Sequence, residues 1–443
     1  MKRVTKILAL ALCVAMLAGI FAACNNDDDT IVLRVYNWED YLSPEVVKNF
    51  EDYMLAEHNQ KVRVEENFFD TNETMFTKIE KGKEKYDLVC PSDYMIEKMI
   101  KAGLCAELDM NLLTNYDENV PAFIKEHFGD FADINGKTYA AGYMWGTLGI
   151  LYNKTKLAEN GDADIIKSWG SLWNENYKNE IFMKDSIRDS IAAVAFYLAG
   201  KDAARTPEQY KAILNDFSDK NIEAVGKALE DQKNKVKTIY EVDEAKNRMA
   251  EPGRDGKGKY AMALMWSGDA MSAILDGANN NVQLGYEIPE EGSNLFFDGW
   301  VIPKDSENYE LAHQFIDFLS TPESAKLNME EIGYTSVVGG QEIFDWAVEE
   351  NKDLAIPFST DVSYFFDNID GAETANINPV RYASWDELQR CAVMQDFGEK
   401  TGAWDDMWVK AKGDSIAWWW WAAIAVVGAG GLIAFMVLRK KKD

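Results

Sequence analysis

Aromatic side chains stand beside carboxylates at several places in this chain. Trp38 directly precedes Glu39 and Asp40. The same combination recurs as Ser92, Asp93 and Tyr94 in PSDYM, Trp266 and Asp269 in MWSGDA, and Phe296, Asp298 and Trp300 in LFFDGW. Ring faces attract cations, and carboxylates accept charge-assisted hydrogen bonds from ammonium groups. Each motif alone also fits ordinary packing beside a solvated acid, but their repetition predicts a shared binding site for an organic ammonium ion.

Strands and helices that alternate along the chain are expected to position these groups. Strand-like runs such as IVLRVYN, KVRVEENFF and YDLVCPS alternate with helical patterns, which is typical of α/β layers. Ser43 and Pro44 predict a helix start in SPEVVKNFEDYM, and Gly333 predicts the end of the helix in TPESAKLNMEEIG. Because ligands of α/β sheets sit at the carboxyl ends of strands, the acidic and aromatic motifs are expected to converge there.

The overall charge limits the partners of the chain. The 443 residues carry 46 Lys and Arg against 74 Asp and Glu, a formal net charge of −28. Such a chain is not suited to bind nucleic acid, because phosphate contacts need basic patches. The excess of acid suits a cationic ligand, although it also fits a surface that is simply kept soluble.

The sequence shows no motif that is typical of a catalytic site or a cofactor site. His58, His127 and His313 are scattered without the spacing of metal ligands. There is neither a glycine-rich phosphate loop nor a serine in a nucleophile elbow. The sequence therefore predicts no enzyme, no metal site and no cofactor.

The cysteines of the main body leave two readings open. Cys90 and Cys105 could form a disulfide in an oxidising compartment, but Cys391 would then remain unpaired. Buried thiols are the favoured interpretation.

The amino-terminal segment has the layout of a secretory signal peptide over residues 1–23. Basic residues precede an apolar run that ends in small residues. The closing letters FAAC resemble a bacterial lipoprotein box, which would make Cys24 the lipidated first residue of the mature chain. Residues 24–30 are expected to form a short polar tether.

The carboxyl-terminal segment predicts a membrane anchor. Residues 416–438 form an uncharged apolar run that is long enough to cross a bilayer core of about 30 Å. The basic tail at residues 439–443 should stay in the cytoplasm, and the tryptophans at 418–421 favour the outer interface. The main body is therefore expected on the extracytoplasmic side of the cell membrane, in the periplasm or at the cell exterior.

A series of motifs along the chain makes the predicted fold and function more specific. YNWEDYLSP, TNETMFTKIEKGKEKYDLVCPSDYMIEKM, YMWGTLGILYN, SWGSLWNENYKNEI, MWSGDA, FFDGWVIP and IGYTSV resemble, in this order, the spermidine/putrescine-binding proteins of bacterial ABC importers. The resemblance implies an α/β, type II periplasmic-binding-protein fold, in which two lobes joined at a hinge close on a polyamine. The chain is expected to cross between the lobes near Trp145, near Leu295 and beyond Tyr334.

These crossings divide the chain into segments. Lobe 1 is expected to comprise residues 31–144 and a return at 295–340. Lobe 2 is expected to comprise residues 145–294 and a return at 341–412.

The motifs and the resemblance together imply the ligand-binding residues. They are Trp38, Glu39, Asp40, Ser92, Asp93, Tyr94, Asp189, Trp266, Asp269, Phe296, Asp298, Tyr334 and Gln395. By this resemblance the rings would sandwich the methylene chain of the polyamine, and Asp189, Asp269 and Asp298 would take its amines. Gln395 comes from the part of the chain that matches most loosely.

Two departures from the family pattern bear on the choice of ligand. Glu39 stands where relatives usually have Ser or Thr, and Ser186 stands where spermidine-preferring relatives often carry an acid. Asp269 and the Phe296–Asp298 pattern look more like the putrescine-preferring branch. Glu39 could replace the acid absent at position 186, so putrescine and spermidine both remain open.

The resemblance implies capture of a polyamine and its delivery to ABC permease subunits. A membrane-tethered polyamine sensor is an alternative. An extracellular enzyme that processes amines is a weaker one, because the chain lacks a nucleophile or a set of metal ligands.

The predicted anchors can be tested separately. With Cys24→Ala, the protein should stay in the membrane fraction, because residues 416–438 would still span the bilayer. Deleting the residues after Lys412 in the Cys24→Ala background should release the protein, as measured by fractionation and immunoblotting. Complete release by Cys24→Ala alone would show that the carboxyl-terminal segment is not an anchor.

Overall fold

The computed structural model describes residues 30–202 and 204–413. The predicted signal peptide, Cys24, the apolar run at 416–438 and the basic tail at 439–443 lie outside these residues and stay predictions. Within the described ranges, none of the helices is long and apolar enough to span a bilayer.

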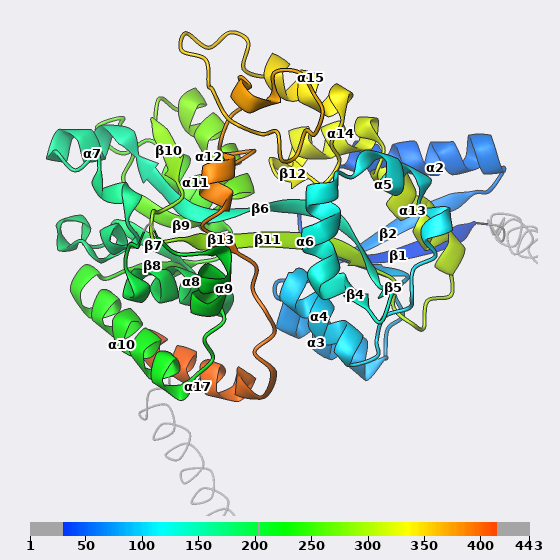
Figure 1. Ribbon diagram of the computed structural model, residues 1–443, viewed down its shortest axis with the longest axis horizontal. Helices are drawn as coiled ribbons and strands as arrows, with labels where there is room; N and C mark the ends of the chain where they lie inside the picture. The colour runs from blue at the N-terminus through cyan, green and yellow to red at the C-terminus, as the bar shows by residue number, and fades with distance from the viewer. Residues whose placement is uncertain (1–29, 203, 414–443) are drawn as a thin grey trace, which may run out of the picture.

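Two α/β lobes lie side by side and are connected by long strands (Figure 1). The elements of the first part of the chain are β1 (Ile31–Asn37), α2 (Pro44–His58), β2 (Val62–Phe68), α3 (Asn72–Lys81), β3 (Leu88–Val89), α4 (Asp93–Lys101), α5 (Thr114–Asn119), α6 (Ala122–Ala132), β4 (Asp133–Ile134), β5 (Lys137–Thr138) and β6 (Ala140–Asn153). The shape agrees with the predicted α/β class.

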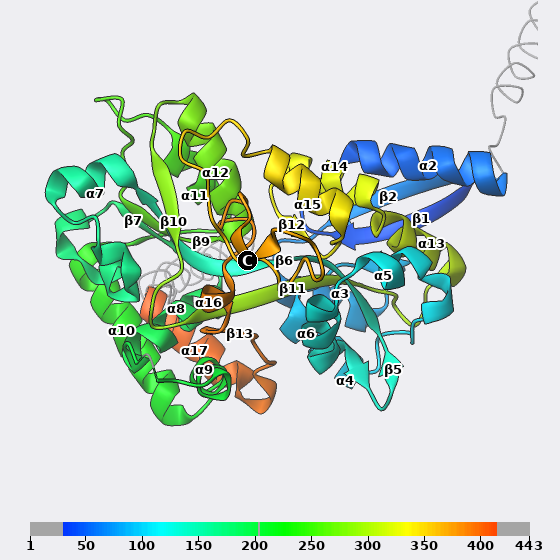
Figure 2. The same ribbon diagram turned by 45° about the horizontal axis from the view of Figure 1, so that its top comes forward.

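The next part of the chain builds the second lobe. Its elements are α7 (Lys154–Asn160), β7 (Ile181–Lys184), α8 (Ile187–Ala199), α9 (Pro207–Leu214), α10 (Asp219–Val236), β8 (Ile239–Glu241), α11 (Glu244–Ala250), β9 (Met262–Trp266), α12 (Ser267–Asn279) and β10 (Leu284–Glu287). Figure 2 shows these elements gathered on one side of the molecule, away from β1 and β2.

The chain then returns to the first lobe and finally to the second. The returning elements are β11 (Ser293–Val301), α13 (Tyr309–Leu319), α14 (Pro322–Ile332), β12 (Thr335–Ser336), α15 (Gln341–Glu349), α16 (Trp385–Leu388), β13 (Cys391–Ala392) and α17 (Thr401–Lys412). Helix α15 packs on α14, whereas α17 packs on α10 of the second lobe. The exact residue bounds of the two lobes stay predictions.

One mixed sheet runs through both lobes. Its strands follow the order β2-β1-β3-β11-β6-β9-β7-β8, with β10 and β12 paired to β6 and β13 paired to β11. Strands β1, β2 and β3 are parallel to one another, as are β7, β8 and β9. Each lobe therefore has a parallel group of strands, whose carboxyl ends are the expected place for a ligand.

Strand β6 connects these two groups. Residues 140–147 pair with β11, and residues 148–152 pair with β9. Thirteen of its residues are buried and Tyr152 is half-buried, so the strand is covered on both faces along its length. A continuous buried strand of this kind holds the lobes in a defined relation at their junction.

Local sequence explains where the helices begin and end. Helix α2 starts at Pro44, whose fixed φ suits the first helical turn, and buries Val46, Phe50 and Met54 at four-residue spacing. Helix α14 starts at Pro322 and is capped by Thr321, and Gly333 ends it in the left-handed region. The predicted start at Pro44 and the predicted end at Gly333 are confirmed.

The predicted strands at the start of the chain also form, with one difference in length. IVLRVYN coincides with β1, and KVRVEENFF contains β2. In YDLVCPS only Leu88 and Val89 pair as β3. The three described cysteines, Cys90, Cys105 and Cys391, are free and buried, which agrees with the favoured interpretation as thiols.

Trp145 lies in β6 where several segments meet. Its side chain is 1% exposed, its indole N–H donates to the carbonyl of Ser336 at 3.2 Å, and its ring stacks on Phe365 with centroids 5.4 Å apart. The ring of Phe123 on α6 approaches it edge-on. One large side chain therefore ties β6 to β12, α6 and the segment near residue 365.

Replacing Trp145 should destabilise the body strongly. Trp145→Ala is expected to lower the free energy of unfolding by about 3–5 kcal/mol, because it removes a buried ring and leaves a cavity. Trp385→Ala is the control, since Trp385 is 38% exposed and should cost less than about 1 kcal/mol. Urea denaturation followed by circular dichroism gives both values, and equal losses would contradict the assignment of Trp145 to the core.

Candidate binding site between the lobes

The predicted residues come from strand ends of both lobes. The segment 38–40 follows β1, and the segment 92–94 follows β3 and opens α4. Asp189 lies in the first turn of α8 after β7, and Asp269 lies in the first turn of α12 after β9. Parallel strands of each lobe thus present these groups at their carboxyl ends, as the α/β pattern predicts. Phe296 and Asp298 come from β11 itself, and Tyr334 directly precedes β12.

Asp298 is a buried carboxylate without an ion-pair partner in the part of the chain that the structure describes. Its side chain accepts a hydrogen bond from the Tyr41 hydroxyl at 2.7 Å and another from Ser92. Burial raises the pKa of Asp298 to about 6, and the nearby charge of Asp189 adds to this rise, whereas the two hydroxyl donors oppose it. Among residues 30–202 and 204–413, no Lys or Arg forms an ion pair with Asp298.

Asp189 is the second carboxylate of this kind. It is buried and accepts a hydrogen bond from the Trp266 indole N–H at 2.8 Å and one from Ser186. Burial raises the pKa of Asp189, because neutral donors replace only part of the lost hydration. Ser186 therefore supports Asp189 directly.

Asp269 differs from the other two carboxylates because it is already paired. Its oxygens lie 2.9 Å from the Lys184 ammonium and 3.4 Å from the Lys246 ammonium, and Tyr334 donates a hydrogen bond to it at 3.1 Å. Burial alone would raise the pKa of Asp269, but the two lysines outweigh burial and lower it. Among residues 30–202 and 204–413, Asp269 is the one of these three acids that forms ion pairs, although the charge of Lys184 also acts on Asp189 and opposes the rise of its pKa.

The aromatic groups line the same region. The Tyr334 ring lies between Tyr41, with centroids 5.0 Å apart, and Phe296, with centroids 6.3 Å apart. Gly268 allows this approach, because a Cβ atom there would come within 2.3 Å of the Tyr334 ring. Burial raises the pKa values of Tyr41 and Tyr334 well above the usual value, so both hydroxyls act as neutral donors.

Tyr94 contacts the other lobe through Arg188. The Arg188 guanidinium stacks on Tyr94 at 3.9 Å and on Phe397 at 3.4 Å, measured to the ring centroids. It also donates to the backbone carbonyl of Gln395 at 2.6 Å, while the Gln395 side chain is exposed. The structure therefore places the backbone of Gln395 at the site's edge and its amide group in solvent.

Asp93 is turned toward the backbone. Its carboxyl group accepts from the amide of Tyr94 at 2.6 Å and from the amide of Phe297 at 3.1 Å. Burial raises the pKa of Asp93 to about 8, so it is largely neutral at pH 7. It holds the start of α4 against β11, and the nearby charge of Asp298 adds to the rise of its pKa.

The first predicted segment lies at the rim. Trp38 is half-buried and packs on Phe69 with ring centroids 4.4 Å apart, whereas Glu39 and Asp40 are exposed. Asp40 has φ of 53°, a left-handed conformation that turns the chain toward α2. Its charge acts on Lys246 of the other lobe, so this rim faces the second lobe.

Sequence reasoning missed Lys184, Lys246 and Arg188. Lys184 could have been noticed, because it is a charged residue at the end of the apolar strand IFMK, directly before the segment that carries Asp189. Lys246 lies on the short helix α11, and the sequence has no signal that brings it to Asp269.

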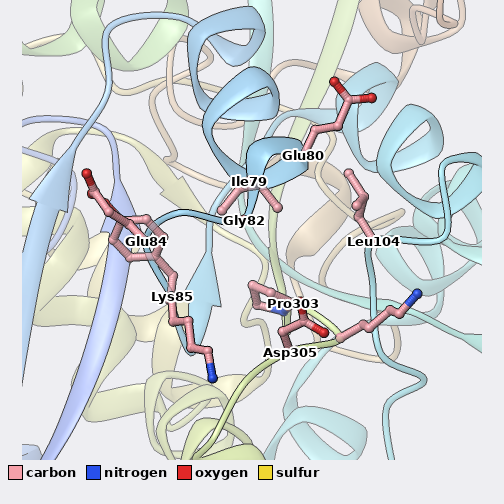
Figure 3. Close-up of a pocket in the computed structure, with 10 residues that line it drawn as sticks. Ile79, Glu80, Gly82, Glu84, Lys85, Leu104, Pro303 and Asp305 are labelled. Carbon is pink, nitrogen blue, oxygen red and sulfur yellow. The ribbon is translucent and has the colours of Figure 1, made fainter.

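A surface hollow elsewhere does not coincide with these residues. Figure 3 shows it between the end of α3, Leu104 and the segment 303–305, with Glu84 and Lys85 at its rim. Lys85 precedes β3, at the amino end of the strand, whereas the segment 92–94 follows the carboxyl end. The acids between the lobes are enclosed by protein, which explains why they do not line an open hollow of this kind.

Comparison with known proteins agrees with this arrangement. Residues 45–340 match the family of bacterial extracellular solute-binding proteins. The putrescine-binding periplasmic protein SpuD of Pseudomonas aeruginosa is 31% identical over 73% of this chain and 82% of its own length. The spermidine/putrescine-binding periplasmic protein of Salmonella typhimurium is 29% identical over 77% of this chain and 87% of its own length.

A solved structure has the same fold. The spermidine/putrescine ABC transporter substrate-binding protein PotD from Streptococcus pneumoniae superposes with a TM-score of 0.61 at 28% identity, covering 86% of this chain and 98% of its own. Fold and sequence agree, and the chain belongs to the bacterial extracellular solute-binding protein family.

Proposed function

We propose that the chain is the extracytoplasmic polyamine-binding component of an ABC importer. The observation that carries this proposal is the pair Asp189 and Asp298, two buried carboxylates that lack a cationic partner among the described residues. A buried charge without a partner costs several kcal/mol, so the pair is best explained by a cation that arrives from outside.

An alkyl polyamine has the chemistry that this place requires. Its ammonium groups would donate charge-assisted hydrogen bonds to the carboxylates of Asp189 and Asp298, and these bonds are stronger than those from neutral donors. Its methylene chain would contact the rings of Phe296, Tyr334 and Trp266. Trp38, Glu39 and Asp40 would meet the outer end of the ligand at the rim.

The names of the relatives support the same class of ligand. SpuD is named for putrescine, and the Salmonella protein is named for spermidine and putrescine. The similarity covers more than two thirds of both chains in each comparison. We therefore propose that this chain also binds a polyamine. From the role of the family we infer that it delivers this ligand to a permease.

Contacts between the lobes provide a means of coupling binding to shape. Tyr334 donates to Asp269 across the junction, and Arg188 stacks on Tyr94 of the opposite lobe. A ligand between the lobes would add contacts to both, so it would shift the equilibrium toward a closed form that a permease can recognise.

We also propose that the body is held at the outer face of the cell membrane. The support is the sequence pattern alone: the lipoprotein-like FAAC, which would lipidate Cys24, and the apolar run at 416–438 followed by basic residues. Two anchors would keep the binding protein close to its membrane partner.

Removing the charge of Asp298 should abolish tight binding. Asp298→Asn keeps the shape but leaves an ammonium group without its partner, which is expected to cost about 3–5 kcal/mol, a weakening of more than about 100-fold. Calorimetry with putrescine, spermidine, spermine and cadaverine measures this on the full-length protein in detergent. Asp52→Asn, which removes an exposed charge, should bind as the wild type does. No heat from wild-type protein with any polyamine would refute the proposed function.

Acid should weaken binding through the same carboxyl group. The pKa of Asp298 is raised to about 6 by burial, so protons compete with the ammonium as the pH falls through 6. The affinity is expected to drop by up to about 10-fold per pH unit below that value. In the ligand-free protein, by contrast, the free energy of unfolding should rise as the pH falls. The raised pKa of Asp298 means that the folded state binds more protons than the unfolded state between about pH 6 and pH 4.

Both trends can be measured on the same samples. Between pH 5 and pH 7, calorimetry gives the affinity and urea denaturation gives the free energy of unfolding. Both quantities should change less with pH in Asp298→Asn than in the wild type. If the affinity of the wild type is constant over this range, the ligand does not compete with a proton for Asp298, and the proposed contact between Asp298 and the ammonium is wrong.

A further inference from the structure

Lys184 has the surroundings that a bound amine would have. Its side chain is 1% exposed, and its ammonium lies 2.9 Å from the carboxylate of Asp269, 2.8 Å from the carbonyl of Val242, and 3.4 Å from the centroid of the Trp266 ring. A carboxylate, a carbonyl and an aromatic face are together a complete set of partners for an ammonium group. The protein supplies that ammonium itself.

The ion pair changes the charge that is left for a ligand. Asp189, Asp269 and Asp298 contribute three negative charges to the buried region, and Lys184 balances one of them. Lys246 also reaches Asp269, but its side chain is 31% exposed and lies farther away, at 3.4 Å. Two carboxylates, Asp189 and Asp298, are left without a basic side chain of the described residues as an ion-pair partner.

We propose that Lys184 fills one amine position of the site and thereby makes the protein select ligands with two ammonium groups over those with three. This inference rests on the proposed polyamine-binding function and specifies the ligand within that class. A diamine such as putrescine matches the two free carboxylates. A triamine such as spermidine brings one positive charge more than the buried carboxylates can neutralise.

A third ammonium would have two unfavourable choices. If it approached Asp269, it would have to displace Lys184 from three partners, and a buried ammonium that loses its partners is strongly destabilised. If it stayed outside, it would meet Glu39 and Asp40, which are exposed, so their attraction would be screened by water and salt. Neither choice compensates fully for the extra charge.

Replacing Lys184 offers a direct test of this selection. Lys184→Met keeps the length of the side chain and removes its charge, and Asp269 would still have Lys246 and Tyr334 as partners. The control is Lys235→Met, which makes the same change of net charge on the exposed face of α10. Thermal unfolding shows whether each full-length variant in detergent is folded.

Calorimetry with putrescine and spermidine then gives the ratio of the two affinities. Wild type and Lys235→Met should prefer putrescine. Lys184→Met should shift the ratio toward spermidine by at least about 10-fold, because the Asp269 oxygen that Lys184 contacts, Oδ2, becomes available to a third amine, whereas Lys246 and Tyr334 contact Oδ1. Adding Asp269→Asn to Lys184→Met should remove this gain, which ties the effect to the vacated carboxylate.

The outcomes separate the two proposals. Wild-type protein that binds neither polyamine would refute the proposed function and this inference with it. Wild-type protein that binds spermidine more tightly than putrescine would overturn the inference alone, even if Lys184→Met failed to fold. An unchanged ratio in folded Lys184→Met would also overturn it and leave the binding function in place.

Discussion

The constraint on which this structure depends is the burial of three carboxylates at the junction of two lobes. The charge of Asp189 adds to the rise that burial causes in the pKa of Asp298, and each of the three acids loses hydration that only a cation can replace fully. Lys184 and Lys246 form ion pairs with Asp269, whereas Asp189 and Asp298 accept hydrogen bonds from neutral donors. Burial raises the pKa values of Asp189 and Asp298, because neutral donors do not stabilise their charged forms as fully as a cation would.

The fold makes such a concentration of acid tolerable. Each lobe aims the carboxyl ends of its own parallel strands at the junction, while β6 and β11 run through it as buried antiparallel strands. The acids therefore stand on rigid elements with packed surroundings, and neutral hydroxyls and an indole N–H hold them in fixed orientations. The same geometry places rings beside the acids, so apolar contact and charge are available to one ligand.

The fold and much of the site were predictable because they depend on local signals. Proline at helix starts, glycine at a helix end and alternating strands predicted α2, α14 and β1. The strand-end motif predicted the place of Asp269, whereas Asp298 lies within β11 and Asp189 was implied only by the family resemblance. The individual partners were not predictable in the same way. Asp93 sits in the predicted motif, yet only the position of β11 makes its carboxyl group bind the Phe297 amide.

Lysines at the site show most clearly what a motif comparison leaves out. Aligning acids and rings identifies the groups that could hold an amine, but the charge of the site is a sum over every buried residue, including those with the opposite sign. Lys184 reaches Asp269 from β7, 85 positions earlier in the sequence, and no local pattern encodes that meeting. Because an ammonium of the protein and an ammonium of a ligand satisfy a carboxylate equally well, the number of charges a ligand should carry follows from the acids that remain unpaired, not from the acids that are present.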